Sequence, residues 1–222
     1  MAATIRTDKI GPVSGSADFT LPTADGSAKS ALITNGSKVL SFATGTPSAS
    51  NFLRGDGTWA AAGGLSEFDM WYLPTSFTGS VFPITTMTRL NFGPEGAPVG
   101  TGMGHSSGTF SFPSTGKWLI TFHMMVHATT TADDYCVALL KTSINTGGAY
   151  VQVAEDSADT PAIGSGGVPE GTCNMTSIYL MDVTNITTHL VQIGSSLQTS
   201  SNTVVGASAQ TNTNVTFMKV AS

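Results

Sequence analysis

The sequence predicts an all-β protein with an extended β stem at its N-terminus, followed by a C-terminal jelly-roll sandwich. Short runs of apolar and β-branched residues recur between Gly, Pro, Asn and Asp, as in antiparallel β proteins. No segment keeps the helical period of 3.6 residues over three turns. Only 10% of the 222 residues are charged, against roughly a quarter in typical soluble domains, while 40% are hydrophobic. This composition argues against disorder and favours a tightly packed assembly.

The first element is a repeat. Leu32-Ile33-Thr34-Asn35-Gly36-Ser37 and Leu53-Arg54-Gly55-Asp56-Gly57-Thr58 share the pattern Leu-x-x-(Asn/Asp)-Gly-(Ser/Thr), 21 residues apart. Asn-Gly and Asp-Gly pairs supply the positive φ angles of a tight hairpin turn. We therefore expect two hairpins, with a short strand over Lys38-Val39-Leu40-Ser41-Phe42 between the two turns. The same turn explains the adhesion-like tripeptide Arg54-Gly55-Asp56 without a receptor.

This repeat has too few large apolar residues to close a core of its own, so it is expected to bury them against partner chains. An alternating segment, residues 5–10, is expected to be a docking strand. The candidate interchain contacts of the stem are Leu32, Phe42, Phe52, Leu53 and Trp59.

Ala60-Ala61-Ala62-Gly63-Gly64 is small and flexible, and is the best linker candidate. The predicted domains are an attachment arm and repeat stem over residues 1–63 and a head over residues 64–222. The head's expected strands are Phe68–Leu73, Ile84–Phe92, Thr109–Phe112, Trp118–Ala128, Tyr135–Thr142, Tyr150–Ala154, Cys173–Val183, His189–Leu197 and Val215–Val220. Many short strands without helices predict a sandwich, most simply a jelly roll.

Charge is unevenly distributed along the chain. Of the total of −5, residues 1–63 carry about +1 and residues 64–222 carry −6. An acidic head argues against nucleic acid as a partner, since nucleic acid needs clustered Lys and Arg. No apolar run approaches the roughly 20 residues that span a bilayer, and Met1–Arg6 lacks the apolar core of a signal peptide, so membrane insertion is not expected.

Acidic residues mark two candidate recognition loops in the head, Thr129–Asp134 and Glu155–Glu170, because recognition commonly sits on loops carried by a rigid scaffold. Their acidic groups are Asp133, Asp134, Glu155, Asp156, Asp159 and Glu170. No EF-hand pattern is present, so solvated carboxylates are favoured, and whether these groups hold Ca²⁺ is left open.

The other residues with chemical potential favour structural roles. His123 and His127 have no Glu between them, which favours two tolerated strand histidines on one face over a zinc pair. Gly100-Thr101-Gly102-Met103-Gly104 lacks the Lys-Ser/Thr of a phosphate loop and favours a strand connection. Cys136 and Cys173 are expected to be buried thiols, although a disulfide between them is left open. We expect no cofactor, no metal, no catalytic residue and no enzymatic activity.

The tryptophans divide between core and interface. Trp71 and Trp118 lie in strand patterns and are expected in the core of the head. Trp118 follows a turn that Pro113 and Gly116 bracket. Trp59 lies among small residues and is expected to pack against another chain.

Four segments resemble known families. Gly108-Thr109-Phe110-Ser111-Phe112-Pro113-Ser114-Thr115-Gly116-Lys117-Trp118-Leu119-Ile120 resembles the front of the C1q/tumour-necrosis-factor-like jelly roll, and Asn214–Val220 resembles its last strand. Ala49–Trp59 is similar to a segment that recurs in bacteriophage tail and appendage proteins, and Gly64–Trp71 resembles the entry to their C1q-like heads. The resemblance implies a homotrimer and carries over no catalytic residues.

These resemblances imply a bacteriophage virion structural protein, assembled in the host cytoplasm. It would be a short trimeric fibre or spike whose arm contacts other virion proteins and whose head touches a host surface glycan or protein. The alternative is a capsid decoration or vertex knob protein that clamps capsid subunits through its N-terminal arm. A depolymerase is disfavoured, because glycan hydrolysis needs paired carboxylates in a groove.

Overall fold

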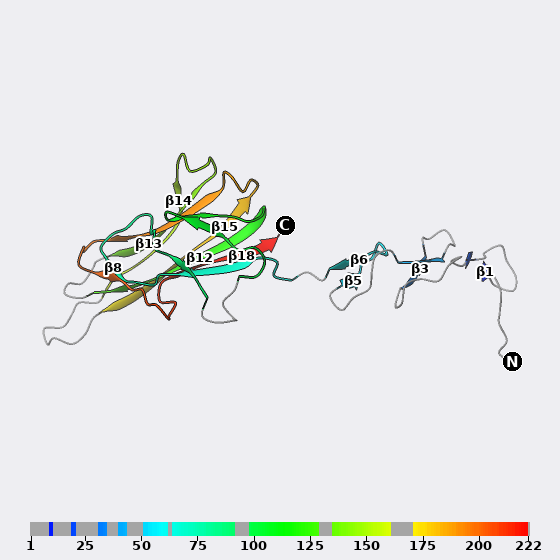
Figure 1. Cartoon of the computed structure of the whole chain (residues 1–222), viewed down its shortest axis with the longest axis horizontal. Coiled ribbons are helices and arrows are strands. Elements are labelled where there is room, and N and C mark those ends of the chain that lie inside the picture. The colour runs from blue at the N-terminus through cyan, green and yellow to red at the C-terminus, as the bar shows by residue number, and fades with distance from the viewer. Residues whose placement is uncertain are drawn as a thin grey trace. The chain divides into compact units, whose positions relative to one another are not determined.

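The computed structural model describes residues 9–10, 19–20, 31–34, 40–43, 51–61, 64–91, 98–128, 135–160 and 171–221. The chain divides into two compact units, Met1–Gly64 and Leu65–Ser222 (Figure 1). All strand pairs in both units are antiparallel, and the described residues contain no helix.

The described residues of the first unit form three separate two-stranded ladders, β1–β2, β3–β4 and β5–β6. Their strands are β1 Lys9–Ile10, β2 Phe19–Thr20, β3 Leu32–Thr34, β4 Leu40–Phe42, β5 Asn51–Leu53 and β6 Trp59–Ala61. An isolated two-stranded ladder is marginally stable at best in water, because it has too little apolar surface to bury. The predicted docking strand is described only at Lys9–Ile10.

The hairpin predicted around Asp56-Gly57 is confirmed, but its turn is wider than a two-residue one. Leu53 pairs with Trp59, and the loop between them is closed by hydrogen bonds from Arg54 N to Thr58 O (2.7 Å) and from Gly57 N to Arg54 O (3.0 Å). Gly57 supplies the positive φ, 79°. Asp56 acts through its side chain, which accepts hydrogen bonds from the backbone N–H and the hydroxyl of Thr58.

The two copies of the repeat do not occupy equivalent places in their hairpins. Asp56-Gly57 lies in the middle of the loop between Leu53 and Trp59. Asn35-Gly36 directly follows Thr34, whose partner is Leu40, and residues 35–39 lie outside the described residues. A shared dipeptide was therefore a correct sign of hairpins but not of their register, which the strand pairing sets.

The second unit, the head, is a jelly-roll sandwich of two antiparallel sheets (Figure 1). One sheet consists of β7 Phe68–Tyr72, β8 Phe77–Thr78, β9 Thr88–Arg89, β12 Gly116–His127, β15 Thr172–Val183, β17 Thr203–Val204 and β18 Asn214–Ala221. The other consists of β10 Gly104–Ser106, β11 Thr109–Ser111, β13 Cys136–Ser143, β14 Val151–Ala158 and β16 Leu190–Leu197. Sheet neighbours are mostly non-consecutive in sequence, as crossing between two layers requires.

The core lies between the sheets, and strict alternation in β12 shows why these residues form it. Every second residue from Trp118 to Val126 is buried, while the residues between are half-buried on the other face. Trp118 is 1% exposed, so its predicted core position is confirmed. Its ring packs 5.2 Å from that of Phe112, and Trp71 packs against the core from a partly buried position.

Most predicted strands of the head are confirmed with ends shifted by a few residues, but one is wrong. In place of a strand over Ile84–Phe92, only Thr88–Arg89 pairs within the described residues. Ile84 is instead a buried anchor whose N–H bonds Ile193 O, 2.9 Å away. The prediction missed β8, β10 and β17, since strands of two or three residues are too short to show alternation.

Strand register separates two ends of the head. At one end, Gly116 of β12 pairs with Val183 of β15, and Lys117 of β12 pairs with Ala221 of β18. Phe68 of β7 pairs with Met218 of β18, so the first strand of the head begins beside the end of its last strand. We call this the entry end. At the opposite end, the far end, His127 pairs with Thr172.

Candidate interaction surfaces

The predicted stem contacts lie on two of the three described ladders of the first unit, the hairpins β3–β4 and β5–β6. Leu32, Phe52 and Leu53 are 52%, 50% and 38% exposed, whereas Phe42 and Trp59 are half-buried. The buried indole nitrogen of Trp59 has no hydrogen-bond acceptor among the described residues. Three of the five residues thus present apolar surface to solvent in the single chain, as is typical of protein interaction surfaces.

The turn beside them carries a compact ion pair. Arg54 Nε lies 3.8 Å from Asp56 Oδ2, and both side chains are more than half exposed. Hydrogen bonds from Thr58 hold the pKa of Asp56 below its ordinary value. The turn therefore has no net charge at neutral pH.

A second apolar surface, missed by the sequence analysis, lies on the head. Two neighbouring rows of outward-facing residues run in register across β15, β12, β18 and β7. We call these residues the open face: Leu180, Leu119, Met218 and Phe68 in one row, and Ile178, Thr121, Thr216 and Met70 in the next. Ile178 and Leu180 are 58% and 53% exposed. Outward positions of a free sandwich are normally polar, so an apolar open face indicates an interaction surface.

The open face is also uncharged, although the head as a whole is acidic. None of its eight residues is ionisable, and the adjoining row carries Lys117 and Asp182 as a pair 2.8 Å apart. The open face therefore adds no like-charge repulsion to a contact between identical copies. A signal for this face was present in Cys173–Val183, where Ile178 and Leu180 are apolar although they fall at the outward positions of a strand that buries Cys173, Met175 and Met181.

The acidic residues chosen as recognition groups are only partly in loops. Glu155 and Asp156 lie in strand β14, so the predicted loop Glu155–Glu170 is wrong at its start. Asp156 Oδ2 accepts the N–H of Thr176 (2.7 Å), joining β14 to β15, and Glu155 accepts a hydrogen bond from Gln152. Asp159 is exposed just beyond the strand. Asp133, Asp134 and Glu170 lie outside the described residues.

The strand ends that flank the two predicted recognition loops nevertheless gather at one place. His127 and Cys136 flank the first loop, and Ala158 and Thr172 flank the second. Cys136 pairs with Ala158 and His127 with Thr172, which places all four at the far end. The loops therefore leave and rejoin the sandwich opposite the end at which the chain enters.

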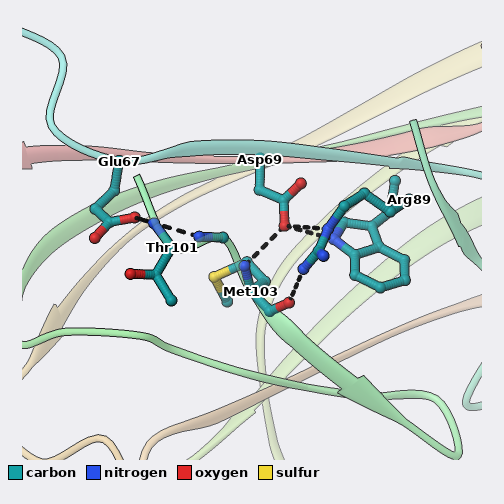
Figure 2. A network of polar contacts seen from close by, with 7 residues as sticks. Glu67, Asp69, Arg89, Thr101 and Met103 are labelled. Atoms are coloured by element: carbon teal, nitrogen blue, oxygen red, sulfur yellow. Dashed lines mark hydrogen bonds and ion pairs between the residues drawn. The ribbon is translucent and has the colours of Figure 1, made fainter. Parts of the chain in front are cut away.

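At the entry end, two carboxylates are held by one glycine-rich loop (Figure 2). Asp69 is 2% exposed, and its Oδ2 accepts hydrogen bonds from Met103 N (2.7 Å), Trp71 Nε1 (3.0 Å) and Arg89 Nε (3.1 Å). The guanidinium of Arg89 also bonds Met103 O and lies 4.8 Å from the Trp71 ring centroid. These contacts tie β7 to β9.

Glu67 completes this arrangement, since its Oε2 accepts the N–H groups of Thr101 (2.9 Å) and Gly102 (3.4 Å). Gly100 and Gly102 both have positive φ, 76° and 75°, which turns successive N–H groups toward the carboxylates. The loop is therefore an anion-binding turn whose anions are the protein's own side chains. This supports the predicted strand connection over a phosphate site.

The remaining chemical candidates are structural. His123 and His127 share one face of β12, as predicted, and this is the outer face; His123 Nδ1 is 3.0 Å from Thr176 Oγ1. His105 packs 4.5 Å from Phe110, and burial lowers the pKa of His105. Cys136 and Cys173 are buried thiols that form no disulfide. Within the described ranges, no three His, Cys, Asp or Glu residues gather as metal ligands. No helix there has the length and apolarity to cross a membrane.

No protein-family model matches the chain, and no curated protein matches it. Among solved structures, the chain is similar to murine APRIL at pH 8.5, with a TM-score of 0.48 and 8% identity over 69% of this chain and 98% of that one. It is also similar to Eiger TNF from S. frugiperda, with a TM-score of 0.47 and 9% identity over 69% of this chain and 92% of that one. The jelly-roll assignment of the head rests on its own sheet order and strand register.

Proposed function

We propose that the chain is a bacteriophage virion structural protein, a short homotrimeric fibre or spike with an N-terminal attachment stem and a jelly-roll head that contacts the host surface. The stem would join other virion proteins, and the head would bind a host glycan or protein without chemical change to it.

The observation that carries this proposal is that both units display apolar surface which a single chain leaves exposed. In the stem these residues are Leu32, Phe52 and Leu53, on ladders of only two strands. In the head they form the open face around Ile178 and Leu180. Burying an apolar side chain contributes roughly 1.5–3 kcal/mol when burial is complete, so covering these residues would favour self-association.

The far end is the proposed contact with the host. It is opposite the end at which the chain enters the head, and the strand ends there carry the loops with Asp133, Asp134, Asp159 and Glu170. Glu155 and Asp156 are not part of this contact, because they belong to strand β14 and not to a loop. Exchange of residues 129–134 and 159–170 is expected to change host adsorption and to leave the oligomer intact.

Sedimentation velocity of the full chain tests the homotrimer directly. A single species with the mass of three chains supports the proposal, and a stable monomer at micromolar concentration overturns it. The open face is tested separately by substitutions described in the Discussion.

The position of the protein in the virion distinguishes the proposed fibre function from the alternative of a capsid decoration protein. Cryo-electron microscopy of phage particles with and without the protein is expected to show density lost from the tail or a host-facing appendage, together with reduced adsorption. Density lost from the capsid surface, with normal adsorption and lower capsid thermal stability, would replace the fibre by the decoration function.

A further inference from the structure

Two hairpins of the stem, β3–β4 and β5–β6, border an open groove. It has a volume of about 440 Å³ and is lined by Leu32, Ile33 and Thr34 from β3 and by Leu53 and the turn Arg54–Gly57 from the next hairpin. Pockets of roughly 300–1,000 Å³ hold drug-sized ligands, so this groove has ample space for a phenyl ring. Its apolar members Leu32 and Leu53 are both exposed.

Hairpin β5–β6 is apolar on its other face as well. Phe52 is 50% exposed and immediately precedes Leu53 in β5. Phe52 is not among the residues that line the groove, and because adjacent residues of a strand point to opposite faces, Phe52 is directed away from the side on which Leu53 meets it. One partner molecule can cover either the Phe52 face or the groove, whereas two neighbouring molecules can cover both.

The surroundings of the groove suit a second copy of the same chain. Arg54 and Asp56 neutralise each other at its rim, so identical stems do not repel there. Hairpins β3–β4 and β5–β6 each have only two strands among the described residues, so copies lying side by side bury apolar surface that neither hairpin buries alone.

We propose that Phe52 of one copy inserts into the groove of the next copy, so that three stems form a closed ring of identical head-to-tail contacts. This inference rests on the proposed homotrimer and specifies how the stem makes it. The contact joins two different surfaces, the Phe52 face and the groove, and such a heterologous contact generates a ring when its rotation closes.

Cysteine cross-linking of the full chain tests the contact. Leu32→Cys places a thiol in the groove, and Phe52→Cys places one on the opposite face; both positions are exposed, so folding is preserved. After mild oxidation, the double variant is expected to run as a covalent trimer on a non-reducing gel, while each single variant stays uncross-linked. Two single variants with different tags, co-expressed, are expected to give a covalent dimer that contains both tags.

The controls separate this inference from the proposed function. The unsubstituted chain, whose Cys136 and Cys173 are buried, reports background oxidation, and Phe52→Cys combined with Ile144→Cys on the head is the matched double variant. Cross-linking of Phe52→Cys to itself overturns the head-to-tail ring, as does a double variant that sediments as a trimer without covalent bonds. A chain that sediments as a monomer overturns the homotrimer and this contact together.

Discussion

Leu119 of β12 lies directly opposite Leu180 of β15 on the face of the sheet that points away from the core. Met218 of β18 flanks Leu119 on its other side in the same row. A second copy of the chain would cover this row of apolar residues at solvent-facing positions. Substitutions in and beside the row therefore test the proposed assembly directly.

Introducing charge into the open face is expected to weaken the proposed trimer. Ile178→Asp with Leu180→Asp should raise the dissociation constant of the full-length trimer by at least about tenfold, equivalent to about 1.4 kcal/mol, because an interface would bury unpaired carboxylates. Analytical ultracentrifugation over a concentration series measures this. Ile144→Asp, at a position 69% exposed on the β13–β14 turn, is the matched control. Equal dissociation constants for the variant and the control would contradict a role for the open face.

Removing the largest core side chain should destabilise the head strongly. Trp118→Ala is expected to lower the free energy of unfolding by about 3–5 kcal/mol, through lost burial and the cavity left behind. Trp118 also donates its indole N–H to Ser114 O (3.2 Å), which fixes the turn before β12. Urea denaturation followed by circular dichroism gives the value. An unchanged midpoint would mean that the ring is not in the core.

The buried carboxylate of Asp69 is expected to be essential to the entry end. Asp69→Asn keeps one oxygen as an acceptor but removes the buried negative charge that pairs with Arg89, so it should cost about 2–4 kcal/mol. Asp182→Asn breaks an exposed ion pair instead and should cost no more than about 1 kcal/mol. Chemical denaturation of both variants compares them. Similar losses for the two would show that the Asp69 network contributes little.

His105 should make the head less stable in mild acid. Burial lowers the pKa of His105 below its ordinary value of 6.5, so the unfolded chain binds this proton more tightly than the folded one. Stability is therefore full above pH 6.5 and falls as the pH drops through 6.5 toward the lower folded-state pKa. His105→Gln is expected to flatten this part of the curve of unfolding free energy against pH, with His123→Gln as the control for loss of a histidine. A curve as steep as that of the unsubstituted protein would exclude His105 as the cause.

Deleting the stem should leave a folded head. A chain that begins at residue 64 retains the unit Leu65–Ser222 with both sheets and the whole core of the head. Cooperative thermal unfolding of this fragment is the expected result, together with its failure to enter virions in a complementation assay. Normal incorporation would remove the stem's proposed docking role, and an unfolded fragment would show that the head depends on the stem.

Much of the head was predictable because its long strands are regular. In β12 the alternation from Trp118 to Val126 indicates both the strand and the face that is buried. The short strands β8 and β17 were not predictable, because two residues carry no periodicity and pair only where the fold brings their partners near. Glu155 and Asp156 were assigned to a loop because charge suggests solvent, and an edge strand satisfies that requirement equally well.

The sequence alone determined the β class, the hairpin around Gly57, the division between a sparse stem and an apolar head, and the burial of Trp118, because all of these follow from local pattern and side-chain size. Only the tertiary structure decided which outward residues line up across strands. Phe68, Leu119, Leu180 and Met218 are far apart in the chain, and their row exists only because β7, β18, β12 and β15 pair in one register. Likewise, the glycine loop 100–104 binds Glu67 and Asp69 because long-range pairing brings them together, a relationship that no local pattern encodes.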